Sequence, residues 1–197
     1  MITSMMFPSR YYQGKDALME FCSRAECWGK SFLFVGSKTA LRVSQAKLEK
    51  SFEGHECTYS FELTSGLPTD PEYDRVRALA EKIAPDVICA VGGGGVIDIC
   101  RSAAMKLGKT LAVIPTTVAS DAACTNVCIH YSDDCSQVIN ADIFHKGPDI
   151  VYVDSTIIAE APMRQLASGI GDALATYYEA HTCRSNGVEQ YGNLNIT

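Results

Sequence analysis

The stretch 87-VICAVGGGGVIDICRSAAM-105 is the most informative about the fold, because an apolar run leads into four consecutive glycines and then into a helical pattern. A short apolar run that ends in glycine is typical of a buried strand, and Gly108 is a plausible stop for the helix that follows. A glycine loop between a parallel strand and a helix offers backbone N–H groups to a ligand, where the helix dipole adds about half a positive charge. The loop therefore predicts either a cradle for a phosphate-bearing ligand or a structural turn. Its spacing is not the G-x-G-x-x-G dinucleotide motif, because Ile97 stands three residues after Gly94.

The segments on both sides of this stretch repeat the alternation of apolar runs and helical patterns. We expect further strands at 31–36, 57–63, 110–115 and 150–154, and further helices at 39–52 and 70–83. Asp70 is expected to cap the second of these helices, with Pro71 at its first helical position. Continuous apolar strands that alternate with helices predict an α/β, Rossmann-like fold, in which a parallel sheet carries helices on both faces.

Two segments depart from this alternation. Residues 124–140 read as two short strands around the turn 132–134, which predicts an antiparallel hairpin attached to the sheet. After Asp154 the pattern is helical nearly throughout. We therefore place a domain boundary near 158–164, which divides the chain into an α/β domain at 1–160 and the first helical segment of an all-α domain at 161–197.

Composition excludes several classes of protein. The 197 residues are 47% apolar and carry a net charge of −6 without a cluster of Lys and Arg, so we expect no nucleic-acid partner. No apolar run reaches the roughly 20 residues that cross a membrane, and the N-terminus lacks the pattern of a signal peptide. The nine cysteines are an odd number and several lie in apolar patterns, so we interpret them as reduced, buried thiols. These features predict a soluble, cytoplasmic protein.

Polar side chains follow the glycines and the next strand. Asp98 is expected in the first turn of the helix, where it satisfies helix N–H groups, orders the glycine loop around a cofactor, or does both. The loop 115-PTTVASDAACTN-126 follows the next strand and offers the polar side chains of Thr116, Thr117, Ser120 and Asp121. Ligands of open α/β sheets bind outside the carboxyl ends of the strands. These side chains are therefore candidates to face a ligand over the glycines, and the alternative for Asp121 is an ordinary turn residue.

Together these segments resemble the glycerol dehydrogenases, within the iron-containing and zinc-containing, dehydroquinate-synthase-like alcohol dehydrogenases. The resemblance rests on VGGGGVIDI at 91–99 and IPTTVASDAACTN at 114–126, after which YSDD, KGPDIVYVD and APMRQLASGIGDALATYYEA follow in the family's order. It implies an N-terminal α/β nucleotide-binding domain, an all-helical C-terminal domain and an active site in the cleft between them.

The resemblance also implies roles for individual residues. Gly92, Gly93 and Gly94 would wrap the pyrophosphate of NAD, with Asp98 behind them. The residues that would line the nicotinamide side or complete the NAD contact are Thr116, Thr117, Ala119, Thr125, Val127 and Tyr131. Asp121 would contact a polyol substrate. Asp172 would be the first protein ligand of a divalent metal, with zinc as the expected ion.

Two residues depart from the family pattern. Gly95 stands where glycerol dehydrogenases usually carry Lys or Ser, so we expect that one phosphate-facing side chain is lost. Ser37 stands where NAD-preferring members have an Asp that bonds the adenosine ribose, which places Ser37 beside the cofactor. Without that carboxylate the repulsion against a 2′-phosphate disappears, so NADP is a second candidate cofactor, with Lys38 in a position to assist.

The metal site that the resemblance implies is incomplete in this sequence. A catalytic zinc needs about three protein ligands, and His181 lies nine residues after Asp172, about 13.5 Å along one helix and on roughly the opposite face. The family's two histidine ligands lie farther downstream than this chain extends. We therefore expect a chain truncated after its N-terminal domain. Its exposed apolar residues, Leu166, Ile170, Leu174 and Tyr177, predict a homo-oligomer.

The function that the resemblance implies is hydride transfer between the secondary carbinol of glycerol, or a similar vicinal diol, and NAD(P), with metal assistance. For the chain as it stands we expect weak or no turnover. The alternative is a non-catalytic nucleotide-binding remnant or subunit partner. A relative that acts on glycerol phosphate or dehydroquinate-pathway substrates would need a second basic cluster, which the sequence does not contain.

Overall fold

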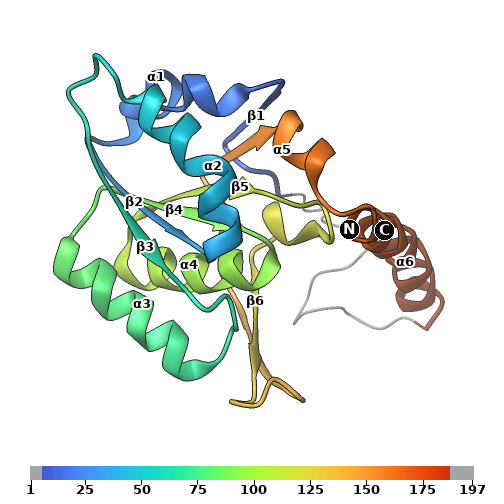
Figure 1. The fold of residues 1–197 in the computed structure, drawn as a ribbon. Coiled ribbons are helices and arrows are strands. Elements are labelled where there is room, and N and C mark those ends of the chain that lie inside the picture. The colour runs from blue at the N-terminus through green and yellow to red at the C-terminus, as the bar shows by residue number, and fades with distance from the viewer. Residues whose placement is uncertain (1–5, 187–197) are drawn as a thin grey trace.

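The computed structural model describes residues 6–186, which form a twisted parallel sheet covered by helices, a separate hairpin and one projecting helix (Figure 1). The main sheet is parallel throughout and runs in the order β1-β8-β5-β4-β2-β3. Its strands are β1 (Arg10–Gly14), β2 (Ser31–Gly36), β3 (Thr58–Leu63), β4 (Val87–Gly92), β5 (Thr110–Pro115) and β8 (Ile150–Asp154). The expected α/β, Rossmann-like fold is confirmed.

The helices cover both faces of the sheet. They are α1 (Phe21–Ala25), α2 (Lys38–Ser51), α3 (Asp70–Ile83), α4 (Gly94–Leu107), α5 (Ser155–Glu160) and α6 (Met163–Asn186), with 3-10 turns η1 (Ala17–Glu20), η2 (Glu26–Trp28) and η3 (Asp121–Ala123). In Figure 1, α1, α2 and α5 lie on one side of the sheet, while α3 and α4 lie on the other. The predicted helix stop is confirmed, since Gly108 adopts the left-handed conformation that ends α4. The helix begins earlier than expected, because Gly94 and Gly95 are already its first two residues.

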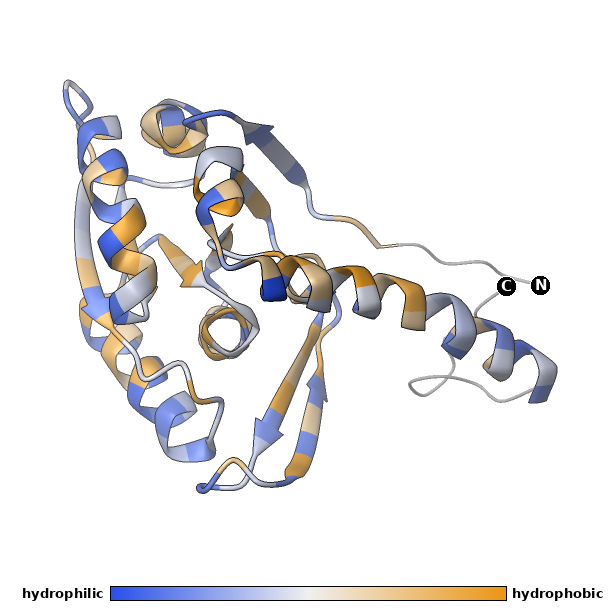
Figure 2. Ribbon diagram, turned by 45° about the vertical axis from the view of Figure 1, so that its right-hand side comes forward, coloured by the Kyte–Doolittle hydropathy of each residue, from blue (hydrophilic) through white to orange (hydrophobic). Residues whose placement is uncertain are grey.

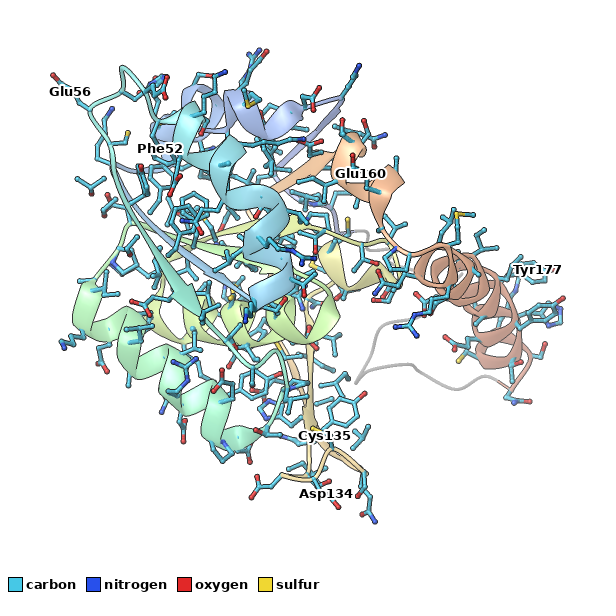
Figure 3. The ribbon with its side chains drawn as sticks, viewed as in Figure 1. Phe52, Glu56, Asp134, Cys135, Glu160 and Tyr177 are labelled. Atoms are coloured by element: carbon cyan, nitrogen blue, oxygen red, sulfur yellow. The ribbon has the colours of Figure 1, made fainter. Side chains whose placement is uncertain are left out.

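The core consists of two layers because successive strand residues point to opposite faces. In β4, Val87, Cys89 and Val91 pack toward α1 and α2. Ile88 and Ala90 pack toward α3 and α4 on the other face. The first layer is rich in aromatic rings. Phe52, labelled in Figure 3, lies with its ring centroid 5.3 Å from that of Phe32 in an edge-to-face pair.

The hairpin differs from its prediction in its second strand, which begins at Val138 and runs to Ile143, and in its attachment. Strands β6 (Val127–Tyr131) and β7 (Val138–Ile143) pair antiparallel as expected, but they form a sheet of their own. An isolated bridge between Thr69 and Tyr131 joins the hairpin to the loop before α3. The hairpin packs on α4 through Cys128, which is fully buried. Its tip, with Asp134 and Cys135, projects away from the sheet (Figure 3).

Two other predictions need correction. Thr69, not Asp70, occupies the N-cap of α3, and Asp70 is the first residue of that helix. The Asp70 carboxylate instead lies 2.7 Å from Nδ1 of His130, so it fastens the hairpin to α3. The strand β1 was missed, because its sequence RYYQG is mostly polar and its only partner, β8, lies far along the chain.

The cysteines are reduced, and they differ in their exposure to solvent. All nine cysteines are free, and four are buried, but Cys27 and Cys124 are exposed, so the expectation of buried thiols holds only in part. Among residues 6–186, no helix has the length and apolar character needed to cross a membrane. Helix α5 ends at Glu160 and α6 begins at Met163, and the domain boundary expected near 158–164 stays a prediction. The tail from 187 onward, from which we expected truncation, lies outside the described residues.

Candidate functional site

Three loops meet at the carboxyl edge of the sheet because the registers of their strands align. Gly36 of β2 pairs with Val91 of β4, and Gly92 of β4 pairs with Pro115 of β5. The chain therefore leaves these three strands at the same level. Ser37, the glycine loop and the loop after Pro115 consequently lie side by side, at the edge where open α/β sheets bind ligands.

The glycine loop presents free backbone donors to this edge. Gly93 is the N-cap of α4, and the first helical hydrogen bond runs from the Ile97 N–H to the Gly93 carbonyl at 3.0 Å. The N–H groups of Gly94, Gly95 and Val96 precede that bond, so they are the donors that a helix start leaves for a ligand. On the other side of the loop, the Thr116 N–H donates to the Gly92 carbonyl at 3.1 Å and ties β5 to the loop.

Each glycine of the loop has a different environment. A Cβ at Gly92 would come within 3.0 Å of Val96, and one at Gly93 within 3.2 Å of Thr117 Cγ2. At Gly94 a Cβ would make only ordinary contacts, 3.5 Å from Ala122 Cβ and 3.6 Å from Ser120 Oγ. The backbone of the loop is thus packed closely on two sides and open for a methyl group at Gly94.

Gly95 corrects one expectation. A Cβ there would overlap the carbonyl oxygen of Gly66, so a side chain at this position would point into the 64–69 loop and not toward a phosphate. That loop is held by Glu72, whose carboxylate accepts hydrogen bonds from Thr64 Oγ1 and the Ser65 N–H. Arg75 and these donors lower the pKa of Glu72 to about 2. The close approach of a braced loop is therefore the reason that residue 95 is glycine.

Two cavities flank the glycine loop. The larger cavity, of about 670 Å³, is lined by eight of the predicted site residues: Gly94, Gly95, Asp98, Asp121, Thr125, Val127, Tyr131 and Asp172. The smaller cavity, of about 570 Å³, is lined by Ser37, Gly93, Thr116 and Thr117 among others. Ala119 lies with Gly93 and Gly94 in a hollow between the two. The structure thus brings the predicted residues to one edge of the sheet, with Gly92 at the end of the strand behind them.

Asp121 and Asp172 both line the larger cavity and contact each other. The Asp121 N–H donates to Asp172 Oδ2 at 3.0 Å, although 51 residues separate them in sequence. Partial burial raises the pKa of the Asp121 carboxyl, and the neighbouring Asp172 carboxylate raises it further. Two adjacent carboxylates favour a cation or a hydroxyl-bearing ligand. Within residues 6–186, however, no group of three or more His, Cys, Asp or Glu side chains is arranged to hold a metal ion.

Asp98 differs from its prediction. It is the fifth residue of α4, beyond the first turn, and it is buried. Its carboxylate accepts hydrogen bonds from Arg101 Nη1 at 2.8 Å and from the Ile129 N–H at 3.2 Å. Burial raises its pKa to about 6 against the opposing effect of the Arg101 guanidinium. Asp98 therefore lines the larger cavity and anchors the hairpin, and it makes no bond to the helix N–H groups that it was expected to satisfy.

Three arginines near the site were missed. Arg101 is fully buried beside Asp98, and the only sign of it in the sequence is a charge pair at i and i+3 in an otherwise apolar segment. Arg42 and Arg164 line the smaller cavity together with Ser37. Ser37 itself caps α2, since its Oγ accepts from the Ala40 N–H at 3.3 Å. Arg164 lies more than 100 residues after Ser37 and Arg42 in the sequence, so no local pattern associates it with them.

Comparison with known proteins identifies relatives of this arrangement. The glycerol dehydrogenase of Escherichia coli O6:H1 is 33% identical over 180 residues, which are 91% of this chain and 49% of that protein. The glycerol dehydrogenase of Thermotoga maritima is 32% identical over 194 residues, which are 93% of this chain and 50% of that protein. The chain therefore spans about half the length of the curated relatives it matches.

The solved structures agree with the sequence relatives. A probable glycerol dehydrogenase from Sinorhizobium meliloti 1021 superposes with a TM-score of 0.88 at 26% identity, over 96% of this chain and 51% of that one. A glycerol dehydrogenase from Schizosaccharomyces pombe gives a TM-score of 0.82 at 28% identity, over 91% and 45%. The family model of the iron-containing alcohol dehydrogenases matches residues 8–155, from β1 to the start of α5. The chain belongs to the iron-containing alcohol dehydrogenase family.

Proposed function

We propose that this chain forms the nucleotide-binding part of a glycerol dehydrogenase-like oxidoreductase that binds NAD(H) across the glycine loop. The observation that carries the proposal is the position of the α4 N-terminus. Its free N–H groups lie between two cavities, one of which is lined by the carboxylates of Asp121 and Asp172. Such donors suit a pyrophosphate. When bound, the dinucleotide would supply the acceptor for a hydride from the secondary carbinol of glycerol or a similar vicinal diol.

The residues of the two cavities would bind different parts of the dinucleotide and the substrate. The backbone at Gly92–Gly95 would hold the pyrophosphate, and Thr116 and Thr117 would lie along the nicotinamide ribose side. Asp121 would accept a hydrogen bond from a polyol hydroxyl through its carboxylate, and its position in the lining of the larger cavity supports this role. Ser37 and its neighbours Arg42 and Arg164 would face the adenosine end. Since no carboxylate stands at residue 37, both NAD(H) and NADP(H) are candidates.

The described residues do not by themselves fit a catalytic metal site, which needs about three protein ligands. We propose that Asp172 contributes one ligand to a divalent metal, zinc or iron, and that the other ligands lie outside residues 6–186. We also place the protein in the cytoplasm, where nine free cysteines remain reduced. Turnover of glycerol by the 197-residue chain alone is expected to be weak or absent, whereas nucleotide binding is expected to persist.

Replacement of Gly94 by Ala tests the cradle. The added methyl group makes only ordinary contacts, so the fold should tolerate it, but it would stand between the loop and a phosphate. We expect the Kd for NADH, measured by fluorescence titration with NADPH in parallel, to rise about tenfold or more, equivalent to ~1.4 kcal/mol. The melting temperature should stay near that of the wild type. Gly171→Ala, at a helical position with open space around it, is the control.

The outcomes separate the two functional classes. Failure of the wild-type chain to bind either nucleotide would leave the loop as a structural turn. Equal affinity in Gly94→Ala and wild type would show that the loop does not approach the phosphates. Binding without NAD(P) reduction in the presence of glycerol and zinc favours a non-catalytic nucleotide-binding part or subunit partner for this chain. Robust turnover by the 197-residue chain would refute the incomplete metal site.

A further inference from the structure

Arg101 lies in the interior between α4, the hairpin and η3. Its side chain is fully buried. Nη1 donates to Asp98 Oδ1 at 2.8 Å and to the Val127 carbonyl at 2.6 Å, and Nη2 donates to the Ala122 carbonyl. One guanidinium therefore joins its own helix to two points of a separate segment.

These two points bracket a segment that lines the larger cavity. Ala122 lies in η3 directly after Asp121, and Val127 is the first residue of β6. Asp98 adds two bonds at the same place, because its Oδ2 accepts from the Ile129 N–H at 3.2 Å and its carbonyl accepts from Cys128 Sγ at 3.2 Å. The segment 122–127 is thus held at both ends by one turn of α4.

The position of Ala122 also determines the geometry of the site on either side. Its Cβ lies 3.5 Å from where a Cβ of Gly94 would be, so it forms the wall opposite the glycine loop. The preceding residue, Asp121, is the one whose N–H reaches Asp172 at 3.0 Å. A shift of the Ala122 carbonyl would therefore move Asp121 relative to both the glycine loop and Asp172.

The energetics argue against a purely stabilising role. Desolvation of a buried ion pair often costs more than the attraction returns, and apolar residues of similar volume frequently stabilise a core as well or better. The guanidinium has a planar, rigid set of N–H donors, so it fixes the positions of the Ala122 and Val127 carbonyls relative to each other. Resting on the proposed function, in which Asp121 contacts the polyol, we propose that Arg101 is a positioning residue that holds the segment 121–127 and keeps Asp121 beside Asp172.

The test is residue-resolved amide hydrogen exchange on the full chain. Arg101→Met alone leaves Asp98 buried without its partner and is expected to destabilise the fold. The double variant Asp98→Asn with Arg101→Met removes both charges, so no unpaired buried carboxylate destabilises the fold and local changes in exchange can be measured. In it we expect the amides of Asp121 and of 122–127 to exchange about tenfold faster, while those of β4 and β5 change less than twofold, as a local opening would give. Arg101→Lys, which keeps the charge and several donors, should restore part of the protection.

Two results would overturn the positioning role. One is a uniform rise of exchange across the sheet, which would mean general stabilisation. The other is unchanged exchange at Asp121 and 122–127. A parallel NADH titration of the wild-type chain keeps the proposals distinguishable. Absence of NADH binding would overturn the nucleotide-binding function, whereas the exchange pattern would still decide whether Arg101 holds this segment.

Discussion

Gly94 and Gly95 are neighbours in α4, yet a different contact accounts for each. At Gly94 a side chain would meet only ordinary neighbours, so its absence leaves the loop open toward a ligand. At Gly95 the carbonyl of Gly66 occupies the space that a Cβ would need. Gly94 leaves room for a ligand, whereas Gly95 leaves room for the 64–69 loop. A substitution at Gly94 is therefore expected to weaken binding, and one at Gly95 to lower the stability of the fold.

Gly95→Ala is therefore expected to destabilise the fold. The 64–69 loop is braced by Glu72 and cannot withdraw freely, so the overlap should cost about 1–3 kcal/mol of the free energy of unfolding. Urea denaturation measures the loss. Gly94→Ala is the matched control, since it lies one residue away at the same helix start and should unfold near the wild-type midpoint. Equal midpoints for the two variants would contradict this explanation of Gly95.

At the scale of elements, α6 is attached to the domain along one narrow strip. Ser168 Oγ donates to the Ala119 carbonyl at 3.1 Å, and Asp172 accepts from the Asp121 N–H. Between them, Gly169 lies so close to the Val118 carbonyl that a Cβ would overlap it. No residue of α6 is fully buried, so these contacts decide where the helix lies.

Gly169→Ala should consequently displace α6, although Ala is the better helix former by about 1 kcal/mol. We expect trypsin to cleave after Arg164 several-fold faster than in the wild type, because the start of the helix loses its support. Gly171→Ala lies two residues away with nothing within 4 Å of its Cβ. That variant should be cleaved no faster than the wild type. Faster cleavage in both variants would mean that the contact with Val118 does not hold the helix.

For the molecule as a whole, α6 is the exposed element. Figure 2 shows it projecting from the domain, with hydrophobic residues mainly in the half nearer the domain and hydrophilic ones toward its C-terminal end. The expected exposure of Leu166, Ile170, Leu174 and Tyr177 is confirmed, at 41%, 56%, 60% and 67%, and Tyr177 points outward in Figure 3. An apolar stripe of this kind marks an interaction surface.

We accordingly expect the 197-residue chain to self-associate through this stripe. Sedimentation velocity should show a concentration-dependent increase in mass, and Ile170→Lys with Leu174→Lys should return the chain to a monomer because two charges would interrupt the apolar surface. Ile139→Lys, at an exposed apolar position on the hairpin, is the control and should leave the association unchanged. A monomeric wild-type chain, or dissociation by the hairpin variant, would argue against α6 as the contact.

Local pattern alone was enough for the order of strands and helices around the glycine loop. Apolar runs and helix stops act within a few residues, so β2, β4, β5, α2 and α4 follow from their own sequences. The family resemblance also selected residues that the fold gathers at one edge, including Asp121 and Asp172. Their roles in binding remain proposals that the nucleotide titrations test.

The contacts between distant segments follow from the packing of the folded chain and not from local sequence. The polar strand β1 becomes a strand because β8 offers it partners, and the hairpin forms its own sheet because it packs on α4. Asp98 accepts hydrogen bonds from Arg101 and from the hairpin, and the Gly66 carbonyl occupies the space that a side chain at Gly95 would need. Each of these contacts joins residues distant in sequence or depends on packing against a distant segment. The periodicity of a sequence shows which side chains are buried, but their partners are determined by how the folded segments pack.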